Sequence, residues 1–403
     1  MTDARLYLFD DGKARRWAPF TLTRPAGELR YGCLTFRERA EFVFGLPCSG
    51  QLSRRALAGF DEPGAAPVLP REEVPPEGTR ILLSSRAVPE FQDPPGLEPG
   101  RLTIGGETVG WILGAGEPLP SEGSMRAPSS VTEGRATELD GEVLVRPWHL
   151  VSGTPGRVAK DVVHLFLDDH QPEGVVRVGK GELSMSSEAE LEPGVVVDTR
   201  HGPVRLDAGA RVEGPARLVG PLYVGRDSTV LGGHVATSSI GPMCKVRGEL
   251  VWSVFHGWDN KSHEGYVGHA MLGRWVNLGA GTTNSDMKNT YGTVRVWTPD
   301  GEEDSGLVKV GCFLGDHVKT GIGTLLNTGT VIGAGSNVYG GVMPPRVVPP
   351  FAWGAGADLR DYRFDQFERV TEAAMARRGE TLTPGVRSVL SQAWRNTRTR
   401  RAE

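Results

Sequence analysis

Three histidines in one stretch of the chain have a side chain and a spacing that catalysis uses. His256, His263 and His269 are separated by seven and by six residues. An imidazole titrates near neutral pH, so one of them can accept a proton as a general base. Three imidazoles and a water molecule are also the ligand set of a catalytic zinc site. Both interpretations need a scaffold that places successive short segments side by side.

A repeat of six residues indicates that scaffold. The clearest run covers 308–343, where glycine often follows the first residue of each hexad. Each hexad predicts one short strand and a tight corner, with its leading side chain inside. Three hexads complete a triangular coil, and stacked coils bury a continuous aliphatic core. The sequence therefore predicts a parallel β-helix from about residue 176. The leading residues are Leu206, Val212, Leu218, Val224, Val230, Leu272 and Leu278, then Val308, Leu314, Thr320, Leu326, Ile332 and Val338.

The repeat is interrupted at 284–307, which predicts a loop extruded from one corner. Loops on rigid scaffolds often carry function. Prolines end the repeat in 342–353. Two helices are expected after it, one over Arg363–Arg378 and one opening at Thr383-Pro384, where Thr is an N-cap and Pro follows it at N1. The basic tail 395–401 is expected to be solvated.

Residues 1–150 lack the repeat. Short apolar runs alternate there with loops and with a helical stretch at Thr35–Phe44, which predicts an α/β domain. Residues 151–175 are expected to connect the two parts, with a helix over Lys160–Asp168. The expected domains are 1–150, the connection 151–175, the β-helix 176–353 and a helical C-terminal segment 354–403.

Composition excludes several classes of protein. Lys plus Arg is 45 and Asp plus Glu is 49, a net charge of −4, which argues against a broad nucleic-acid-binding surface. Glycine supplies 55 of 403 residues, about twice the usual share, as tight corners require. No run of 18 apolar residues occurs, and the first residues are acidic, so we expect neither membrane span nor signal peptide. The four scattered cysteines predict reduced thiols in a cytoplasmic protein.

With the repeat and its interruption described, the chain resembles a known family. Segment 240–353, with KSHEGYVG, NLGAGT and the hexads that follow, is similar to the bifunctional N-acetylglucosamine-1-phosphate uridyltransferase/glucosamine-1-phosphate acetyltransferases, in particular a divergent bacterial branch. The resemblance implies a nucleotidyltransferase-like α/β N-terminal domain and a left-handed parallel β-helix that forms a homotrimer. It also implies acetyl-CoA as co-substrate and synthesis of UDP-N-acetylglucosamine from small-molecule substrates, amino-sugar phosphate and UTP.

The resemblance also implies roles for individual residues of the β-helix. His263 matches the catalytic histidine, which would deprotonate the sugar amine as it attacks the thioester. The family's lysine is missing from 249–255, and Arg247 or Lys245 is a candidate substitute. The implied sugar-phosphate ligands are Lys261, Tyr266, Asn277, Asn284, Lys288 and Arg247, and the implied acetyl-CoA ligands are Ala280, Asp316 and Gly340.

In the N-terminal domain, segment 9–29 resembles the family's triphosphate loop. Arg16, Thr21 and Arg24 are the implied nucleotide ligands, because cations stabilise phosphates. The family's glycine-rich loop and lysine are missing. Ser84, Ser85 and Arg86 stand where its Mg²⁺-binding aspartate is expected. If nucleotidyl transfer survives, it should need Mg²⁺.

Three functions remain open from the sequence. The first is the bifunctional enzyme. The second is an acyltransferase acting on this or another amino sugar, with a degenerate N-terminal domain. The third is a non-catalytic trimeric scaffold that binds sugar nucleotides. Acetyl-CoA turnover separates the first two from the third, and release of pyrophosphate separates the first from the second.

Overall fold

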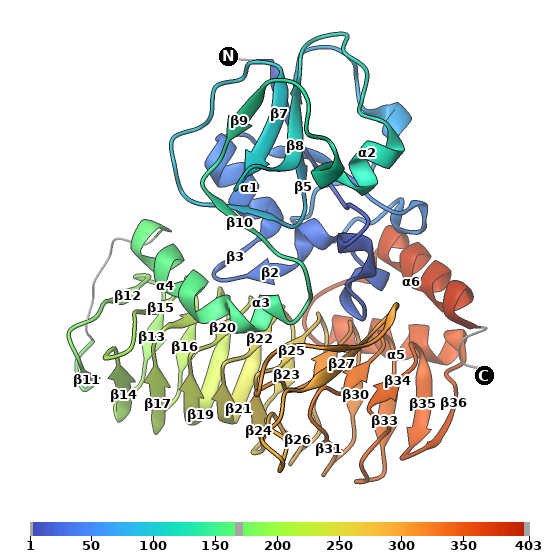
Figure 1. Ribbon diagram of the computed structural model, residues 1–403. Coiled ribbons are helices and arrows are strands. Elements are labelled where there is room, and N and C mark those ends of the chain that lie inside the picture. The colour runs from blue at the N-terminus through green and yellow to red at the C-terminus, as the bar shows by residue number, and fades with distance from the viewer. Residues whose placement is uncertain (1–2, 166–171, 399–403) are drawn as a thin grey trace. The chain divides into compact units, whose positions relative to one another are not determined.

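The computed structural model describes residues 3–165 and 172–398, in two compact units (Figure 1). The first unit comprises Met1–Leu29, Leu34–Pro147 and Glu368–Asn396, and the second comprises Arg30–Cys33, Trp148–Phe367 and Thr397–Glu403. Residues 368–396, expected in a separate C-terminal segment, thus group with the N-terminal unit. The predicted helical residues 166–168 and tail residues 399–401 lie outside the described residues.

A six-stranded mixed sheet, in the order β4-β1-β5-β8-β7-β9, forms the core of the first unit. Strand β1 lies between two parallel neighbours, and it is apolar on both faces. Leu6 and Leu8 join one apolar cluster, whereas Tyr7 and Phe9 join another on the opposite face. The strands are β1 (Ala4–Phe9), β4 (Cys48–Leu52), β5 (Thr79–Ser84), β7 (Gly100–Ile104), β8 (Glu107–Leu113) and β9 (Ala136–Glu138), with the pair β6 (Ala87–Pro89) and β10 (Gly141–Val143) beside them. Short strands β2 (Arg30–Tyr31) and β3 (Leu34–Thr35) precede the first helix.

Three helices of this unit begin at side-chain caps, of which only Thr383 was predicted. Helix α1 (Phe36–Phe44) starts with a capping box between Thr35 and Glu38, as the predicted helical stretch required. Helix α2 is Glu122–Arg126. Helix α6 (Pro384–Thr397) follows Thr383, whose hydroxyl accepts from the backbone N–H of Val386. Both expected C-terminal helices are confirmed, the other being α5 (Phe364–Ala376).

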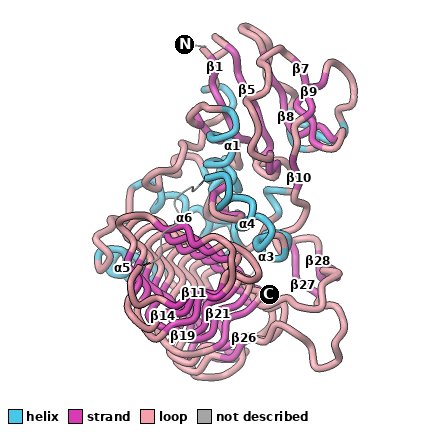
Figure 2. Tube along the Cα trace, turned by 90° about the vertical axis from the view of Figure 1, so that its left-hand side faces the viewer, coloured by secondary structure: helices cyan, strands magenta, loops and turns pink. Residues whose placement is uncertain are grey.

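The second unit is a parallel β-helix with three strand-bearing faces, seen along its axis in Figure 2. One face is a nine-stranded parallel sheet. It contains β12 (Leu183–Met185), β15 (Val204–Leu206), β18 (Leu222–Val224), β20 (Ser239–Ile240), β22 (Val254–Phe255), β25 (Met271–Leu272), β29 (Phe313–Leu314), β32 (Val331–Ile332) and β34 (Val347–Val348).

Strands β19 (Thr229–Ala236) and β21 (Lys245–Val251) turn a corner and contribute to both other faces. The second face also holds β11 (Val176–Val178), β14 (Val195–Asp198), β17 (Ala216–Val219) and β24 (Tyr266–Gly268), continued by β26 (Thr283–Asn284) and β31 (Leu325–Leu326). The third holds β13 (Glu190–Leu191), β16 (Arg211–Val212), β23 (Asn260–Lys261), β30 (Lys319–Thr320), β33 (Asn337–Tyr339), β35 (Ala352–Ala355) and the antiparallel β36 (Asp358–Asp361).

The predicted inward residues are buried, with one exception. Leu314, Leu326, Ile332 and Val338 belong to one continuous apolar core, and Thr320 is also buried. The prediction that Val308 leads the first hexad of the clear run and points inside is wrong, because Val308 is 43% exposed. An isolated antiparallel bridge between Met287 and Lys309 ties that segment to the preceding excursion, so regular coils resume only afterwards.

The interruption at 284–307 is confirmed as an excursion from the coils, and it contains the antiparallel hairpin β27 (Arg295–Thr298) and β28 (Gly301–Asp304) (Figure 2). Helices α3 (His149–Ser152) and α4 (Thr154–Leu165) precede the β-helix. A buried ion pair, Arg157–Asp161, and a hydrogen bond from Cys33 N–H to Asp161 stabilise α4.

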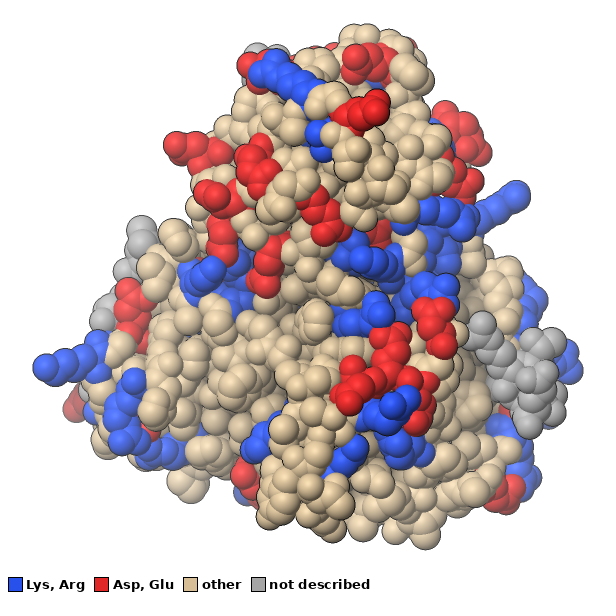
Figure 3. All heavy atoms as spheres, viewed as in Figure 1, with Lys and Arg blue, Asp and Glu red and all other residues tan. Residues whose placement is uncertain are grey.

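The charges on the face drawn in Figure 3 are of both signs and interspersed, in line with the net charge of −4. In the part of the chain that the structure describes, no helix combines the length and the apolar character that crossing a bilayer requires.

Candidate functional site

His263 lies on an exposed corner just after β23. Two backbone hydrogen bonds stack this corner on the next two coils: Gly281 N–H donates to Glu264 O at 3.0 Å, and Gly323 N–H donates to Ala280 O at 2.8 Å. The motif that carries His263 and the motif NLGAGT are therefore neighbours in space. The imidazole can reach a ligand, while its backbone is held by the coils.

Beside this corner runs a line of outward polar side chains, which we call the polar ladder: Asn260, Asn277, Lys319 and Asn337. Each is the direct strand partner of the next. The amide of Asn260 donates to the amide oxygen of Asn277 at 2.9 Å, which fixes the first step. The polar ladder thus places Asn277, predicted from the resemblance, next to Lys319, which was not among the predicted sugar-phosphate ligands.

The predicted cations are engaged within the protein. The ammonium of Lys261 is buried and donates to the backbone oxygens of Arg247 and His263, at 2.6 and 3.0 Å. Burial lowers the pKa of Lys261 to about 8. Arg247 pairs with Glu264 at 2.9 Å, and Lys288 donates to Thr293 O. Lys261 therefore stabilises the His263 corner, and none of the three cations is free for a ligand.

Lys319 differs from these three cations. Its ammonium has no hydrogen-bond acceptor and no ion-pair partner among residues 3–165 and 172–398. The residue is half-buried, and desolvation lowers the pKa of its ammonium to about 8. A positive charge without a compensating acceptor favours an anion from outside the chain.

Asn284 and Tyr266 lie on another face of the same coils. The amide of buried Asn284 accepts from Gly268 N–H at 3.0 Å and donates to Gly268 O at 2.9 Å, so it joins two coils. Tyr266 donates to Asp286 at 2.7 Å, and burial together with this contact raises the pKa of Tyr266. Both side chains are therefore engaged with partners outside the polar ladder.

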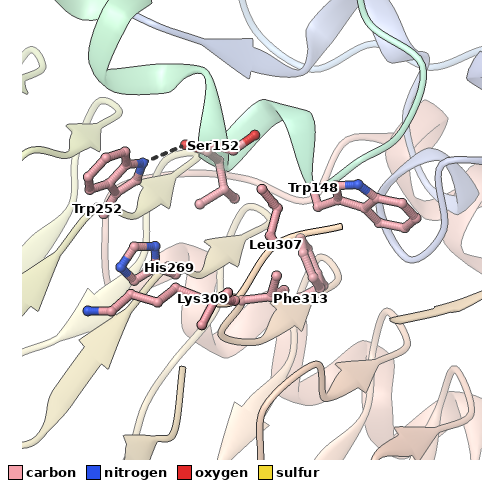
Figure 4. Close-up of a pocket in the computed structure, with 10 residues that line it drawn as sticks. Trp148, Ser152, Trp252, His269, Leu307, Lys309 and Phe313 are labelled. Carbon is pink, nitrogen blue, oxygen red and sulfur yellow. Dashed lines mark hydrogen bonds between the residues drawn. The ribbon is translucent and has the colours of Figure 1, made fainter. Parts of the chain in front are cut away.

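His269 belongs to the same cluster as Tyr266 and Asp286. Its Nε2 lies 3.4 Å from Asp286, and its ring stacks on Trp252 with centroids 5.3 Å apart. Burial lowers the pKa of His269 to about 4, so the imidazole is neutral at pH 7. The stacked pair borders a largely apolar cavity of about 250 Å³, together with Trp148 and Phe313 (Figure 4).

The three histidines are not brought together within one chain. His256 is buried, His263 is exposed, and His269 contacts Asp286. Within the described ranges, no three His, Cys, Asp or Glu side chains gather in a group that could hold a metal ion. The zinc interpretation therefore has no support from the arrangement within a single chain.

The predicted acetyl-CoA residues lie on different corners of the helix. Ala280 lies in the stacked corner already described, and Gly340, with φ of 90°, follows β33. Asp316 is buried, and its carboxylate accepts from Arg274 N–H at 2.8 Å. The Asp316 side chain thus stabilises a corner within the protein.

In the N-terminal unit the three predicted nucleotide ligands differ in their exposure. Arg16 is exposed, and Thr21 is buried. Arg24 is only 1% exposed, and its guanidinium forms two hydrogen bonds to Glu62, at 2.8 and 2.9 Å. The assignment of Arg24 to the triphosphate needs correction, because a buried, doubly bonded guanidinium is a structural group. Sequence spacing could not reveal a partner 38 residues away.

The Mg²⁺ that the resemblance implies can be tested against the residues after β5. Arg86 stands there, and its guanidinium lies 2.6 Å from the carboxylate of Asp11, with Ser84 Oγ donating to the same carboxylate at 3.2 Å. Both charged side chains are buried, at 3% and 1% exposure. The guanidinium of Arg86 neutralises Asp11, and Asp10, beside Ser85, accepts hydrogen bonds from the N–H of Ala26 and the hydroxyl of Ser53, so the residues present do not fit a divalent cation.

A cavity of about 670 Å³ lies in the same unit and was missed by the sequence reasoning. Its lining includes five arginines, two glutamates and apolar side chains from four segments of the chain. The charged residues are Arg15, Arg54, Arg55, Arg71, Arg126, Glu72 and Glu122. The signal available beforehand was the pair Arg54-Arg55 directly after β4.

The comparisons with known proteins cover both units. Residues 6–166 match the sugar nucleotidyl transferase family. A bifunctional sugar-1-phosphate nucleotidylyltransferase/acetyltransferase of Sulfurisphaera tokodaii is 30% identical over 203 residues, covering 50% of this chain and 46% of that protein. A bifunctional protein GlmU of Acaryochloris marina is 25% identical over 197 residues, covering 43% of this chain and 39% of that one. The chain is thus similar, at low identity, to these bifunctional proteins. The family resemblance stated from the sequence is confirmed.

The chain spans less than half the length of these curated relatives. Among solved structures, a putative acetyltransferase from Bacillus cereus is 11% identical with a TM-score of 0.24, covering 56% of this chain and 98% of that chain. The predicted fold class, a nucleotidyltransferase-like domain followed by a parallel β-helix of hexapeptide repeats, is confirmed, and its left hand stays an implication of the resemblance.

Proposed function

We propose that the β-helix transfers an acetyl group from acetyl-CoA to the amine of an amino-sugar phosphate, glucosamine-1-phosphate in the first instance. The observation that carries this is the exposed His263 corner, stacked on the NLGAGT corner and flanked by the polar ladder. The relative whose name includes acetyltransferase supports the reaction class. Another amino sugar as acceptor remains the alternative.

In the proposed reaction the imidazole of His263 accepts the proton of the sugar amine as its nitrogen attacks the thioester carbonyl. A C–N bond forms, the C–S bond breaks, and the coenzyme A thiolate leaves and is protonated. The backbone N–H of Ala280 is the proposed donor to the tetrahedral oxyanion. Lys261 holds the His263 carbonyl and so keeps the base in place.

We assign the anionic group of the acceptor to Lys319, the neighbour of Asn277 in the polar ladder. Replacing Lys319 by methionine should raise the KM for the sugar phosphate about tenfold or more, because a hydrogen bond to a charged group is worth about 1.5–3 kcal/mol. The KM for acetyl-CoA should not change. Steady-state kinetics with each substrate varied in turn measure both constants.

The matched control is Lys180→Met, a substitution of an exposed lysine elsewhere on the same β-helix. It should leave both KM values as in the wild type. Equal KM values for the sugar phosphate in Lys319→Met and wild type would remove Lys319 from the site.

We further propose that the protein is a homotrimer whose sites lie at subunit boundaries and include the excursion 284–307. Light scattering at micromolar concentration should give three times the chain mass of 43.4 kDa. A monomer under these conditions would contradict the proposal.

The proposed activity is tested by one product assay with acetyl-CoA, UTP and candidate amino-sugar phosphates. Formation of N-acetylated sugar phosphate is the expected result. No turnover of acetyl-CoA with any acceptor would favour the non-catalytic scaffold instead.

A further inference from the structure

The apolar cavity beside His269 belongs to the β-helix unit alone, and none of the ligands implied by the resemblance lines it. Its volume is about 250 Å³. A cavity of about 150 Å³ is enough to hold benzene, so this one has room for one or two rings. Val308 is 43% exposed and the side chain of Lys309 is 52% exposed, so the cavity is open to solvent. The lining residues are Trp148, Val151, Ser152, Trp252, His269, Leu307, Val308, Lys309, Val310 and Phe313.

The stacking of the coils builds one aromatic wall of this cavity. Trp252 and His269 directly follow β21 and β24, which are paired strands, and His269 N–H donates to Val251 O at 3.0 Å. Their rings therefore lie one above the other, with 22° between the ring planes. The indole Nε1 of Trp252 donates to Val151 O at 3.2 Å and so fixes the pair against α3 (Figure 4). The wall is thus formed before any ligand arrives.

The imidazole of His269 offers this cavity a hydrogen-bond acceptor. Its Nε2 lies 3.4 Å from Asp286, and a carboxylate there favours the tautomer that carries its hydrogen on Nε2. Burial lowers the pKa of His269 to about 4, so the ring is neutral at pH 7 and Nδ1 keeps its lone pair. Within the described ranges 3–165 and 172–398, Nδ1 has no hydrogen-bond partner. A donor on a ligand would satisfy it.

The charges around the cavity are balanced within the protein. Among the described residues that line it, only Lys309 carries a charge, and its ammonium lies 4.0 Å from Asp286. The same carboxylate accepts from the hydroxyl of Tyr266 at 2.7 Å. An uncharged ligand therefore fits better than an ion. The cavity is also distinct from the proposed acetyl-transfer site, because His263 precedes β24 whereas His269 follows it.

We propose that this cavity binds a small, uncharged aromatic compound that donates an N–H or O–H to Nδ1 of His269. Aromatic walls favour an aromatic ligand, because rings attract one another in edge-to-face and offset arrangements beyond the gain from burial. Trp148, Trp252 and Phe313 supply such rings, and the aliphatic side chains exclude water from the rest of the ligand. The single acceptor selects the compound that carries a donor.

Two ligands of nearly equal shape test this proposal with the full chain. Indole carries an N–H, and benzofuran has an ether oxygen in its place. In ligand-detected NMR titrations at pH 7, indole should bind with a Kd of about 1 mM or below, as ligands of this size do. Benzofuran should bind about fivefold or more weakly, because it cannot donate to Nδ1. No saturable binding of indole at about ten times that concentration, or equal Kd values for the two, would overturn the proposal.

Two variants locate the binding. His269→Phe keeps a ring against Trp252 but removes the acceptor, so it should weaken indole about fivefold or more and leave benzofuran unchanged. Val308→Trp should block both ligands, because it places a large side chain in the lining. Its matched control is Val176→Trp, at an exposed valine of β11 outside the lining, which should bind both as the wild type does.

Unchanged binding of indole to Val308→Trp would place the ligand elsewhere, and unchanged binding to His269→Phe would exclude Nδ1 as its partner. These titrations contain neither acetyl-CoA nor a sugar phosphate. Their outcome is therefore independent of the proposed acetyl transfer.

Discussion

Replacing His263 by alanine is expected to lower acetyl transfer by about a hundredfold or more, the size of effect typical for loss of a general base. The side chain is exposed on its corner, so its loss removes little packing from the apolar core. The backbone of that corner stays fixed by Lys261 and by the stacked coils. A kcat measurement at saturating substrates, with circular dichroism on the same sample, separates catalysis from folding.

The matched control is His201→Ala, which removes another exposed histidine of the β-helix. Its kcat should equal that of the wild type. Wild-type acetylation by His263→Ala would exclude His263 as the base. If zinc chelation abolished the activity of the wild-type protein, the result would instead favour a zinc site formed by residues of more than one chain.

The β-helix could be predicted because its physics is local. Each hexad buries one leading side chain. The position of Leu314 or Ile332 in the repeat therefore predicts that it points into the core, and no tertiary contact needs to be known. The register failed at Val308, where the excursion ends. An excursion has no fixed length, so periodicity cannot say at which residue the coil resumes.

The polar ladder shows which part of the site the hexad register can predict and which part it cannot. Asn277 and Lys319 each directly precede an inward residue, Leu278 and Thr320, so both point outward on one face. The register thus predicts that both residues point outward on the same face. The excursion separates them in sequence, and only the strand pairing shows that no other coil lies between them.

The ion-pair partners of buried charged side chains could not be predicted from the sequence. The family-like spacing around Arg24 favoured a ligand role, yet the guanidinium is enclosed with Glu62. Similarly, Arg86 was recognised as a replacement for an acidic residue, but its pairing with Asp11 depends on the sheet that brings β1 and β5 together. Long-range ion pairs carry no signal in spacing, because tertiary packing decides them.

Glu62→Ala is expected to destabilise the N-terminal unit by about 3–5 kcal/mol, because it removes the carboxylate that pairs with the buried charge of Arg24. The two side chains are 1% and 9% exposed, so water cannot replace the lost carboxylate without opening the unit. The melting temperature of that unit should fall by about 10 °C, measured by differential scanning calorimetry. The double variant Arg24→Met/Glu62→Leu should recover most of the loss, since an apolar pair of similar volume leaves no charge to solvate. If Arg24 instead served a ligand, Glu62→Ala would melt like the wild type, and the double variant would lose UTP binding without gaining stability over the single one.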